Sequence, residues 1–462
     1  MEIKLFGAAK TVTGSCYSLT SNKDKILVDC GMFQGGKDRV KLNYAEFSFA
    51  PKHYKALLLS HAHLDHCGRI PKLLKEGFKG KIYSTAATKD LAFIVLMDSA
   101  KIAAHDTEYE NKRRIKEGLP KREPIYTEKD VRAAMSLFQV INYNRPVKIS
   151  RNITATFYDA GHILGAASIM LEMCEGAKNT TIVFSGDLGQ TGNPIVRDPE
   201  TITKADYLFI ESTYGDRLHV QVKERKNKFL EVIRATYKKG GKLLIPSFAI
   251  ERSQELLYDI NEFVEKNLMP PINIYLDSPM AIKSTEVFKK HPECYDQEIK
   301  ALLKSGDNPF TFPGLTYSES TDNSKRLDHL KEPCVIIAGS GMCTGGRIKH
   351  HIRQYIDDPK NTILFVGYQV QGTLGYWIKE GRSKIKLLGV EARVRSKVES
   401  IDSFSGHADY KGLLNWLKYF TPSPKKVFIT HGDEKSAVSL SDKIKKLGID
   451  TYIPGMKDSI RL

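Results

Sequence analysis

Short apolar runs that end in polar residues dominate the first 210 residues. Four of them are Ile26–Asp29, Ala56–His61, Thr181–Asp187 and Tyr207–Glu211. Continuous apolar runs of this length are typical of strands buried in a sheet, and residues just past strand ends lie on loops at one rim, where chemistry is usually placed. Each predicted strand therefore delivers an acid or a histidine to that rim.

Residues 88 to about 140 show helical spacing of apolar positions and many charged residues. We expect helices that cover the sheet, together with an exposed basic loop around Lys116 to Glu123. Charge runs of this kind usually form a solvated surface.

From about residue 220 the chain alternates between helical segments and short apolar strands at residues 242–246, 272–276, 334–338 and 362–366. Strands that alternate with helices predict a parallel sheet. Short strands return near Ser383 and lead into polar clusters like those of the first part. The simplest interpretation is one α/β domain, residues 1–210 and 384–462, interrupted by an inserted domain of residues 211–383.

Length and composition limit the possible classes of protein. A chain of 462 residues is too long for one ordinary core, and its 41% hydrophobic and 27% charged residues are typical of a globular protein rather than a disordered or membrane-embedded one. No signal peptide is visible, and no apolar run reaches the roughly 20 residues of a membrane span. The seven cysteines are scattered without a CxxC spacing, which favours reduced thiols. We expect a soluble, cytoplasmic enzyme.

The formal net charge of +16 would concentrate polyanions near the surface, so nucleic acid leads the list of partners. A generally basic composition, useful only for solubility, explains the charge equally well. The charge therefore needs a site beside it.

The segment Ser60-His-Ala-His-Leu-Asp-His66 places three histidines and an aspartate in six residues directly after a predicted strand. Imidazole and carboxylate are ligands that zinc accepts, and the alternation directs successive pairs toward two adjacent positions. Further ligands should come from other strand ends, and the candidates are His162, Asp187 and His431. Each of these is flanked by glycine, which lets the backbone approach a metal closely.

These residues resemble the motifs of the metallo-β-lactamase superfamily, with HxHxDH as the second motif. The resemblance implies an αββα sandwich with two Zn²⁺ ions at one edge, although Mn²⁺ also occupies such sites. By that pattern one zinc takes His61, His63 and His162, the other takes Asp65, His66 and His431, and Asp187 bridges them. Asp29 resembles the first-motif acid, which supports neighbouring ligands and loops rather than binding metal.

Three later segments resemble motifs A, B and C of the β-CASP family. They are Ile210-Glu-Ser-Thr-Tyr-Gly215, Ser405-Gly-His-Ala-Asp409 and Thr430-His-Gly-Asp433, carried by Glu211, His407 and His431. Histidine in motif C resembles the RNA-processing members of the family. The glycine-containing segments Gly7–Tyr17 and Gly339–Gly346 resemble those of the cleavage and polyadenylation endonuclease branch, in a short form without KH domains. The resemblance is compatible with a homodimer.

Two loops of the inserted domain are candidates for RNA binding. The loop from Gly339 to Arg347 follows a strand and precedes a predicted helix near Ile348, so its backbone amides could cradle a phosphate while Arg347 adds a bidentate donor. A tight glycine turn explains the segment equally well. The residues concerned are Ser340, Gly341, Gly345, Gly346 and Arg347, with a second loop contributing Ser247 and Arg252.

The predicted function is zinc-dependent hydrolysis of single-stranded RNA, endonucleolytic with 5′ exonuclease activity as an alternative. Asp65 belongs to the catalytic centre, His407 is the predicted proton donor and Glu211 its partner. A turn with a hydrogen-bonded imidazole is the alternative for His407. The rival functions are a small-molecule hydrolase, a catalytically inactive RNA-binding subunit and a DNA nuclease.

Overall fold

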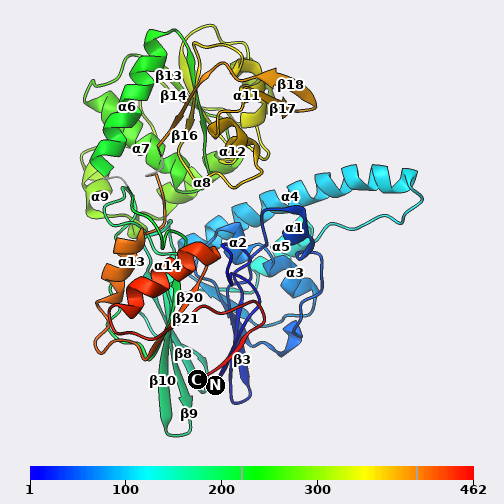
Figure 1. Ribbon diagram of the computed structural model, residues 1–462, viewed down its shortest axis with the longest axis vertical. Coiled ribbons are helices and arrows are strands. Elements are labelled where there is room, and N and C mark those ends of the chain that lie inside the picture. The colour runs from blue at the N-terminus through cyan, green and yellow to red at the C-terminus, as the bar shows by residue number, and fades with distance from the viewer. Residues whose placement is uncertain (220–221, 402–403) are drawn as a thin grey trace. The chain divides into compact units, whose positions relative to one another are not determined.

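The structure is a computed structural model that describes residues 1–219, 222–401 and 404–462, and it divides into two compact units (Figure 1). The first unit comprises Met1–Thr191, Asp198–Leu218 and His407–Leu462. The second comprises Gly192–Arg197 and His219–Gly406. The chain therefore leaves the first unit, builds the second and returns, as expected for an inserted domain.

Two seven-stranded sheets form the centre of the first unit. One sheet has the order β22 (Ser459–Arg461), β1 (Glu2–Leu5), β2 (Tyr17–Ser21), β3 (Asp24–Val28), β4 (Ala56–Leu58), β5 (Lys81–Ser84) and β6 (Phe138–Val140). The other has the order β21 (Thr451–Tyr452), β20 (Lys426–Thr430), β11 (Tyr207–Glu211), β10 (Lys178–Phe184), β9 (Ala167–Glu175), β8 (Ile153–Asp159) and β7 (Val147–Ser150).

A single apolar core joins the two sheets. Leu19 and Ile26 from the first sheet pack in one cluster with Phe157, Phe184 and Phe209 from the second. Burying this much aromatic and aliphatic surface is the main force that holds two sheets face to face.

Helices cover the outer faces of both sheets. Helices α13 (Tyr410–Leu417) and α14 (Glu434–Lys445) bury Trp416 and Leu440 against Ile210 and Ile429 of the second sheet. Helices α3 (Ile70–Lys75), α4 (Ala86–Lys116) and α5 (Glu128–Met135) pack together beside the first sheet (Figure 1). These four layers are the αββα sandwich that the sequence predicts, and this fold class is confirmed.

The segment after residue 86 is one continuous helix, α4, of 31 residues. Thr85 caps its start, since the Thr85 side chain accepts a hydrogen bond from the backbone N–H of Thr88. The predicted basic loop at residues 116–123 follows α4, and all of its residues are exposed.

The second unit contains a six-stranded sheet whose paired strands are all parallel. Its order is β14 (Leu315–Tyr317), β13 (Asn273–Leu276), β15 (Cys334–Ala338), β12 (Lys242–Pro246), β16 (Thr362–Phe365) and β19 (Lys397–Ser400). Residues 397–400 therefore extend the sheet of the second unit, because β19 pairs with β16.

Helices flank the parallel sheet on both faces (Figure 1). On one face Ile348 and Ile352 of α11 (Ile348–Tyr355) and Ile378 of α12 (Leu374–Lys379) pack against Leu244 and Ile336. The other face carries α6 (Val222–Lys238), α7 (Arg252–Glu265) and α8 (Pro279–Lys290). None of the helices in the described part of the chain is long and apolar enough to cross a membrane.

Candidate metal centre

The predicted metal ligands follow the carboxyl ends of strands in the first unit. Strand β3 runs parallel to β4, and β10 runs parallel to β11, which runs parallel to β20. Parallel strands end at the same edge of a sheet, which brings their following loops together. The structure gathers all of the predicted ligands into two groups, His61, His63, His162 and Asp187 in one and Asp65, His66 and His431 in the other.

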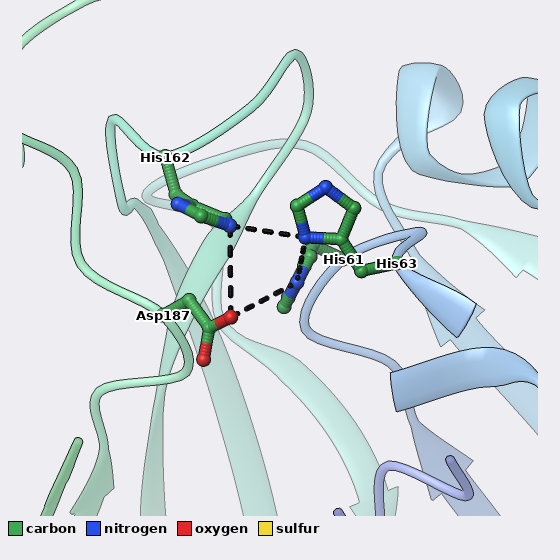
Figure 2. A group of neighbouring side chains, drawn as sticks. All are labelled: His61, His63, His162 and Asp187. Atoms are coloured by element: carbon green, nitrogen blue, oxygen red, sulfur yellow. Dashed lines mark hydrogen bonds and ion pairs between the residues drawn. The ribbon is translucent and has the colours of Figure 1, made fainter. Parts of the chain in front are cut away.

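The first group is formed by three imidazoles and one carboxylate that point toward a common centre (Figure 2). Nδ1 of His63 lies 3.1 Å from Nε2 of His61 and 3.1 Å from Nε2 of His162. Oδ2 of Asp187 lies 3.4 Å from Nε2 of His61 and 3.5 Å from Nε2 of His162. Four donor atoms therefore surround one point.

The second group is built around the other oxygen of the same aspartate. Nε2 of His66 lies 3.1 Å from Nε2 of His431 and 3.4 Å from Oδ1 of Asp187. Oδ2 of Asp65 lies 3.4 Å from Nε2 of His431. Asp187 thus directs one carboxylate oxygen to each group, as a bridging ligand would.

The donor set fits zinc. Zinc takes nitrogen and oxygen ligands in a tetrahedron with bonds of about 2.0–2.1 Å, which places neighbouring donor atoms about 3.3 Å apart. The donor atoms here are 3.1 to 3.5 Å apart. Oδ1 of Asp187 is buried without a hydrogen-bond partner among the described residues, although an unsatisfied buried carboxylate oxygen is costly. A cation between the donors removes that cost.

Burial also sets the protonation of the first group. It lowers the pKa of His61 to about 3 and that of His63 to about 4, and the pKa of His162 also falls well below its ordinary value. These rings are therefore neutral at pH 7 and have a free lone pair, which is the form that binds a metal.

Asp29 lies behind the second group and contacts His66, one of the predicted ligands, rather than the centre of the group. Its Oδ2 is 2.7 Å from Nδ1 of His66 and accepts a hydrogen bond of 2.8 Å from the hydroxyl of Ser60. Its Oδ1 accepts a hydrogen bond of 2.8 Å from the backbone N–H of Ser60. Burial lowers the pKa of His66, but the carboxylates of Asp187 and Asp29 outweigh this and raise it well above the ordinary value. A carboxylate on the far ring nitrogen orients a ligand histidine and makes it more basic.

A carboxylate–histidine pair lies directly beside the two groups. Nδ1 of His407 is 3.2 Å from both carboxylate oxygens of Glu211, which is fully buried, and 3.9 Å from Oδ2 of Asp187. Glu211 also accepts a hydrogen bond of 2.7 Å from the backbone N–H of Leu188. Burial lowers the pKa of His407, but the charges of Glu211 and Asp187 outweigh it and raise this pKa to about 9. Because Asp187, Glu211 and His407 could themselves hold a cation, a ligand role for His407 stays open.

The other acids of the β-CASP-like motifs cap helices. The side chain of Asp409 accepts a hydrogen bond from the backbone N–H of Gly412 at the start of α13. Asp433 does the same for Ser436 at the start of α14. These two acids stabilise the helix starts that follow His407 and His431.

Ser60 and Thr213 are site residues that the sequence did not predict. The hydroxyl of Ser60 lies 3.1 Å from Nδ1 of His61, and that of Thr213 lies 3.3 Å from Nδ1 of His431. Each was detectable only as a neighbour, since Ser60 directly precedes the histidine cluster and Thr213 follows Glu211 by two residues.

The predicted RNA-binding residues lie in the second unit, and α11 begins at Ile348 as predicted. The guanidinium of Arg347 donates to Oδ1 of Asp277 at 2.7 Å and to the carbonyl oxygens of Ser318 and Glu319. Arg252 is buried and forms an ion pair with Glu255. Both arginine side chains are paired with groups of the protein itself. Their roles in RNA binding stay predictions.

Three family models match successive parts of the chain. Residues 18–198 match the metallo-beta-lactamase superfamily domain, residues 253–378 the Beta-Casp domain, and residues 391–454 the Zn-dependent metallo-hydrolase RNA specificity domain. Ribonuclease TTHA0252 of Thermus thermophilus is 38% identical over 95% of each chain. The chain belongs to the metallo-β-lactamase superfamily, in its Beta-Casp branch. It is a member of a family of zinc-dependent hydrolases, as the motifs predict.

Other relatives and a solved structure extend this picture. An RNase J-like protein of Methanocaldococcus jannaschii is 34% identical over 98% of this chain and 97% of its own length. Transcription termination factor FttA of Methanosarcina mazei is 32% identical over all of this chain and 72% of its own length. The crystal structure of a protein of unknown function from Enterococcus faecalis has a TM-score of 0.55 at 12% identity, covers 100% of this chain and 99% of its own, and shows a shared fold.

Proposed function

We propose that the chain is a zinc-dependent ribonuclease that cleaves the phosphodiester backbone of single-stranded RNA, predominantly at internal positions. The observation that carries this proposal is the pair of donor groups that share Asp187. The same residues belong to a chain that is similar to Ribonuclease TTHA0252 and to an RNase J-like protein over nearly its whole length.

The site would hold two metal ions. His61, His63 and His162 would bind one, Asp65, His66 and His431 the other, and Asp187 would bridge them, with Asp29 orienting His66. Bound zinc supplies a water nucleophile of lowered pKa and withdraws charge from the phosphate oxygens. Mn²⁺ is the alternative ion for these ligands.

His407 is proposed to protonate the departing 3′ oxygen. It is not needed to complete either donor group, its side chain is 20% exposed, and Glu211 holds its Nδ1. The hydrogen bond with Glu211 fixes the ring through Nδ1, and Nε2 is the nitrogen that would carry the proton that the leaving oxygen requires.

RNA is the proposed substrate because of charge and of family. The net charge of +16 favours a polyanion, since each phosphate that a cation neutralises releases counterions. The match of residues 391–454 to an RNA specificity domain points to RNA among polyanions.

The decisive experiment compares substrates in one assay. Zinc-loaded protein is incubated with end-labelled single-stranded RNA, with DNA of the same sequence and with a thioester, and Asp187→Ala serves as the metal-centre control. Internal cleavage of RNA alone, lost in Asp187→Ala, supports the proposal. Preferred cleavage of DNA or of the thioester, or RNA binding without cleavage, would each establish a rival function.

A further inference from the structure

The second unit carries an exposed phenylalanine that the proposed chemistry does not use. Phe248 follows strand β12 and is 42% exposed. No other phenylalanine among the described residues belongs to the exposed large hydrophobic side chains. Leaving part of such a ring in water has a cost, since burial of apolar surface is favourable. A ring that stays exposed despite this cost is expected to have a binding partner.

Glycine at position 341 lets the ring lie against the backbone. A Cβ atom added to Gly341 would lie 2.9 Å from Cδ2, 3.0 Å from Cε2 and 3.1 Å from Cγ of Phe248. Three adjacent ring atoms at nearly equal distances mean that Gly341 meets the face of the ring, because an edge-on approach would make one atom clearly nearer than its neighbours. One face of Phe248 therefore rests on Gly341, and its exposed area belongs to the rest of the ring.

Hydrogen bonds between neighbouring loops hold Gly341 and Phe248 in place. The amide of buried Gln369 donates to the carbonyl oxygen of Gly341 at 2.9 Å and to that of Gly367 at 3.1 Å. The hydroxyl of Ser253 donates to the carbonyl oxygen of Phe248 at 2.7 Å. The loops after β12, β15 and β16 are thus tied together at the carboxyl edge of the parallel sheet, which is where α/β folds bind ligands.

A second exposed ring, Tyr368, lies in the loop after β16. Tyr368 comes directly after Gly367, whose added Cβ would lie 3.4 Å from Cε2 of Phe248, and it is 53% exposed. Among the described side chains of this unit, the exposed aliphatic residues are Leu268, Leu388 and Val390, and they lie on other segments. A protein-binding patch gathers apolar side chains of several kinds, whereas a nucleobase needs one flat ring and close backbone.

We propose that Phe248, together with Tyr368 of the loop after β16, is a stacking platform for a nucleobase of single-stranded RNA. The inference rests on the proposed ribonuclease function and adds a base-contacting site within the second unit. Stacking is sequence-tolerant because every base has a π-face, so the platform would grip the strand without selecting its sequence.

The test pairs variants that differ in the ring with substrates that differ in the base. Phe248→Leu keeps an apolar side chain but removes the π-face, Phe248→Trp keeps the face, and Tyr419→Ala removes an exposed aromatic residue of the first unit as a control. The substrates are single-stranded RNAs with one abasic residue moved along the strand. Hydrolysis of bis(p-nitrophenyl) phosphate by each zinc-loaded variant reports on the metal centre independently of any nucleobase.

We expect Phe248→Leu to lower kcat/KM for RNA by about 5- to 150-fold, the usual range for losing one stacked base. Phe248→Trp and Tyr419→Ala should retain it, and all variants should hydrolyse bis(p-nitrophenyl) phosphate equally. One abasic position should weaken the wild type by a similar factor and have no further effect on Phe248→Leu, which identifies the base that the ring contacts.

Two results would overturn the platform. If Phe248→Leu cleaves RNA like the wild type, or if its effect multiplies with that of every abasic position, the ring does not stack on a base. These results leave the ribonuclease intact. If instead the wild type hydrolyses bis(p-nitrophenyl) phosphate but not RNA, the proposed function fails and the platform falls with it.

Discussion

Each unit contains a cluster of aspartate and histidine side chains, and the two clusters satisfy their polar atoms in opposite ways. In the second unit His351 lies 2.6 Å from Asp277 through Nε2 and 2.7 Å from Asp328 through Nδ1, and Asp277 also accepts from Arg347. Donors there face acceptors. In the first unit imidazole nitrogens face one another at 3.1 Å, and Oδ1 of Asp187 has no hydrogen-bond partner among the described residues.

The difference separates a structural cluster from the proposed ligand cluster, although both are made of the same residue types. A histidine between two carboxylates is a closed network that needs nothing from outside. Neutral histidines whose lone pairs converge repel one another unless a cation lies between them. The same contrast applies to the histidine–carboxylate pairs Glu211–His407 and Asp277–His351, since only His407 lies beside the ligand groups.

Asp187→Ala should produce the largest change, because one side chain contributes to both donor groups. Metal content should fall from two ions per chain to fewer than one, and RNA cleavage should fall to background. Elemental analysis of the purified variant beside the wild type gives the count. Retention of both metals would show that Asp187 is not a bridging ligand.

His407→Ala should slow RNA cleavage by roughly 10²- to 10⁴-fold, the usual contribution of a general acid, while both metals and the fold remain. The matched variant His407→Gln keeps a side chain that hydrogen-bonds but cannot donate a proton of suitable pKa, and it should be as slow. The readouts are kcat and metal content. Loss of a metal ion would make His407 a ligand, and an unchanged kcat would leave it no chemical role.

Asp29→Ala should have a smaller effect on the same centre. Removing a carboxylate that orients a ligand histidine typically costs 10- to 100-fold in metal affinity. Competition against a chromogenic zinc chelator measures the change, and excess zinc should restore most of the activity. A variant that stays inactive in saturating zinc would mean that Asp29 does more than position His66.

His351→Ala should leave RNA cleavage by the folded protein unchanged. It should reduce the free energy of unfolding by about 3–5 kcal/mol, as expected when one partner of a buried ion pair is removed. Burial lowers the pKa of His351, but its hydrogen bonds with Asp277 and Asp328 raise it above the ordinary value of 6.5. The stabilisation is therefore complete below pH 6.5 and is lost as the pH rises through the raised pKa.

Urea unfolding of the wild type and of His351→Ala at several pH values measures this difference in stability. The gap between the two proteins should narrow above neutral pH. A gap that widens with rising pH would mean that His351 is neutral in the folded protein.

The sequence predicted the strand ends well because they depend on local pattern. Tyr207–Glu211 and Lys242–Pro246 form strands with the predicted bounds, since apolar runs flanked by polar residues leave little choice of register. Long-range partners outside the recognised motifs could not be predicted. Nothing in the local pattern around Arg347 indicates that Asp277, 70 residues away, would bind its guanidinium. For the same reason the contact between Gly341 and the ring of Phe248 could be recognised only in the structure.

Titration of metal-free protein with zinc, followed at once by bound metal and by cleavage of end-labelled single-stranded RNA, tests the central claim most directly. We predict no cleavage without metal and a rise in cleavage that reaches its plateau only when two zinc ions are bound per chain. Full cleavage in the presence of a strong chelator, or a plateau with no zinc bound to the histidine–aspartate groups, would contradict the account.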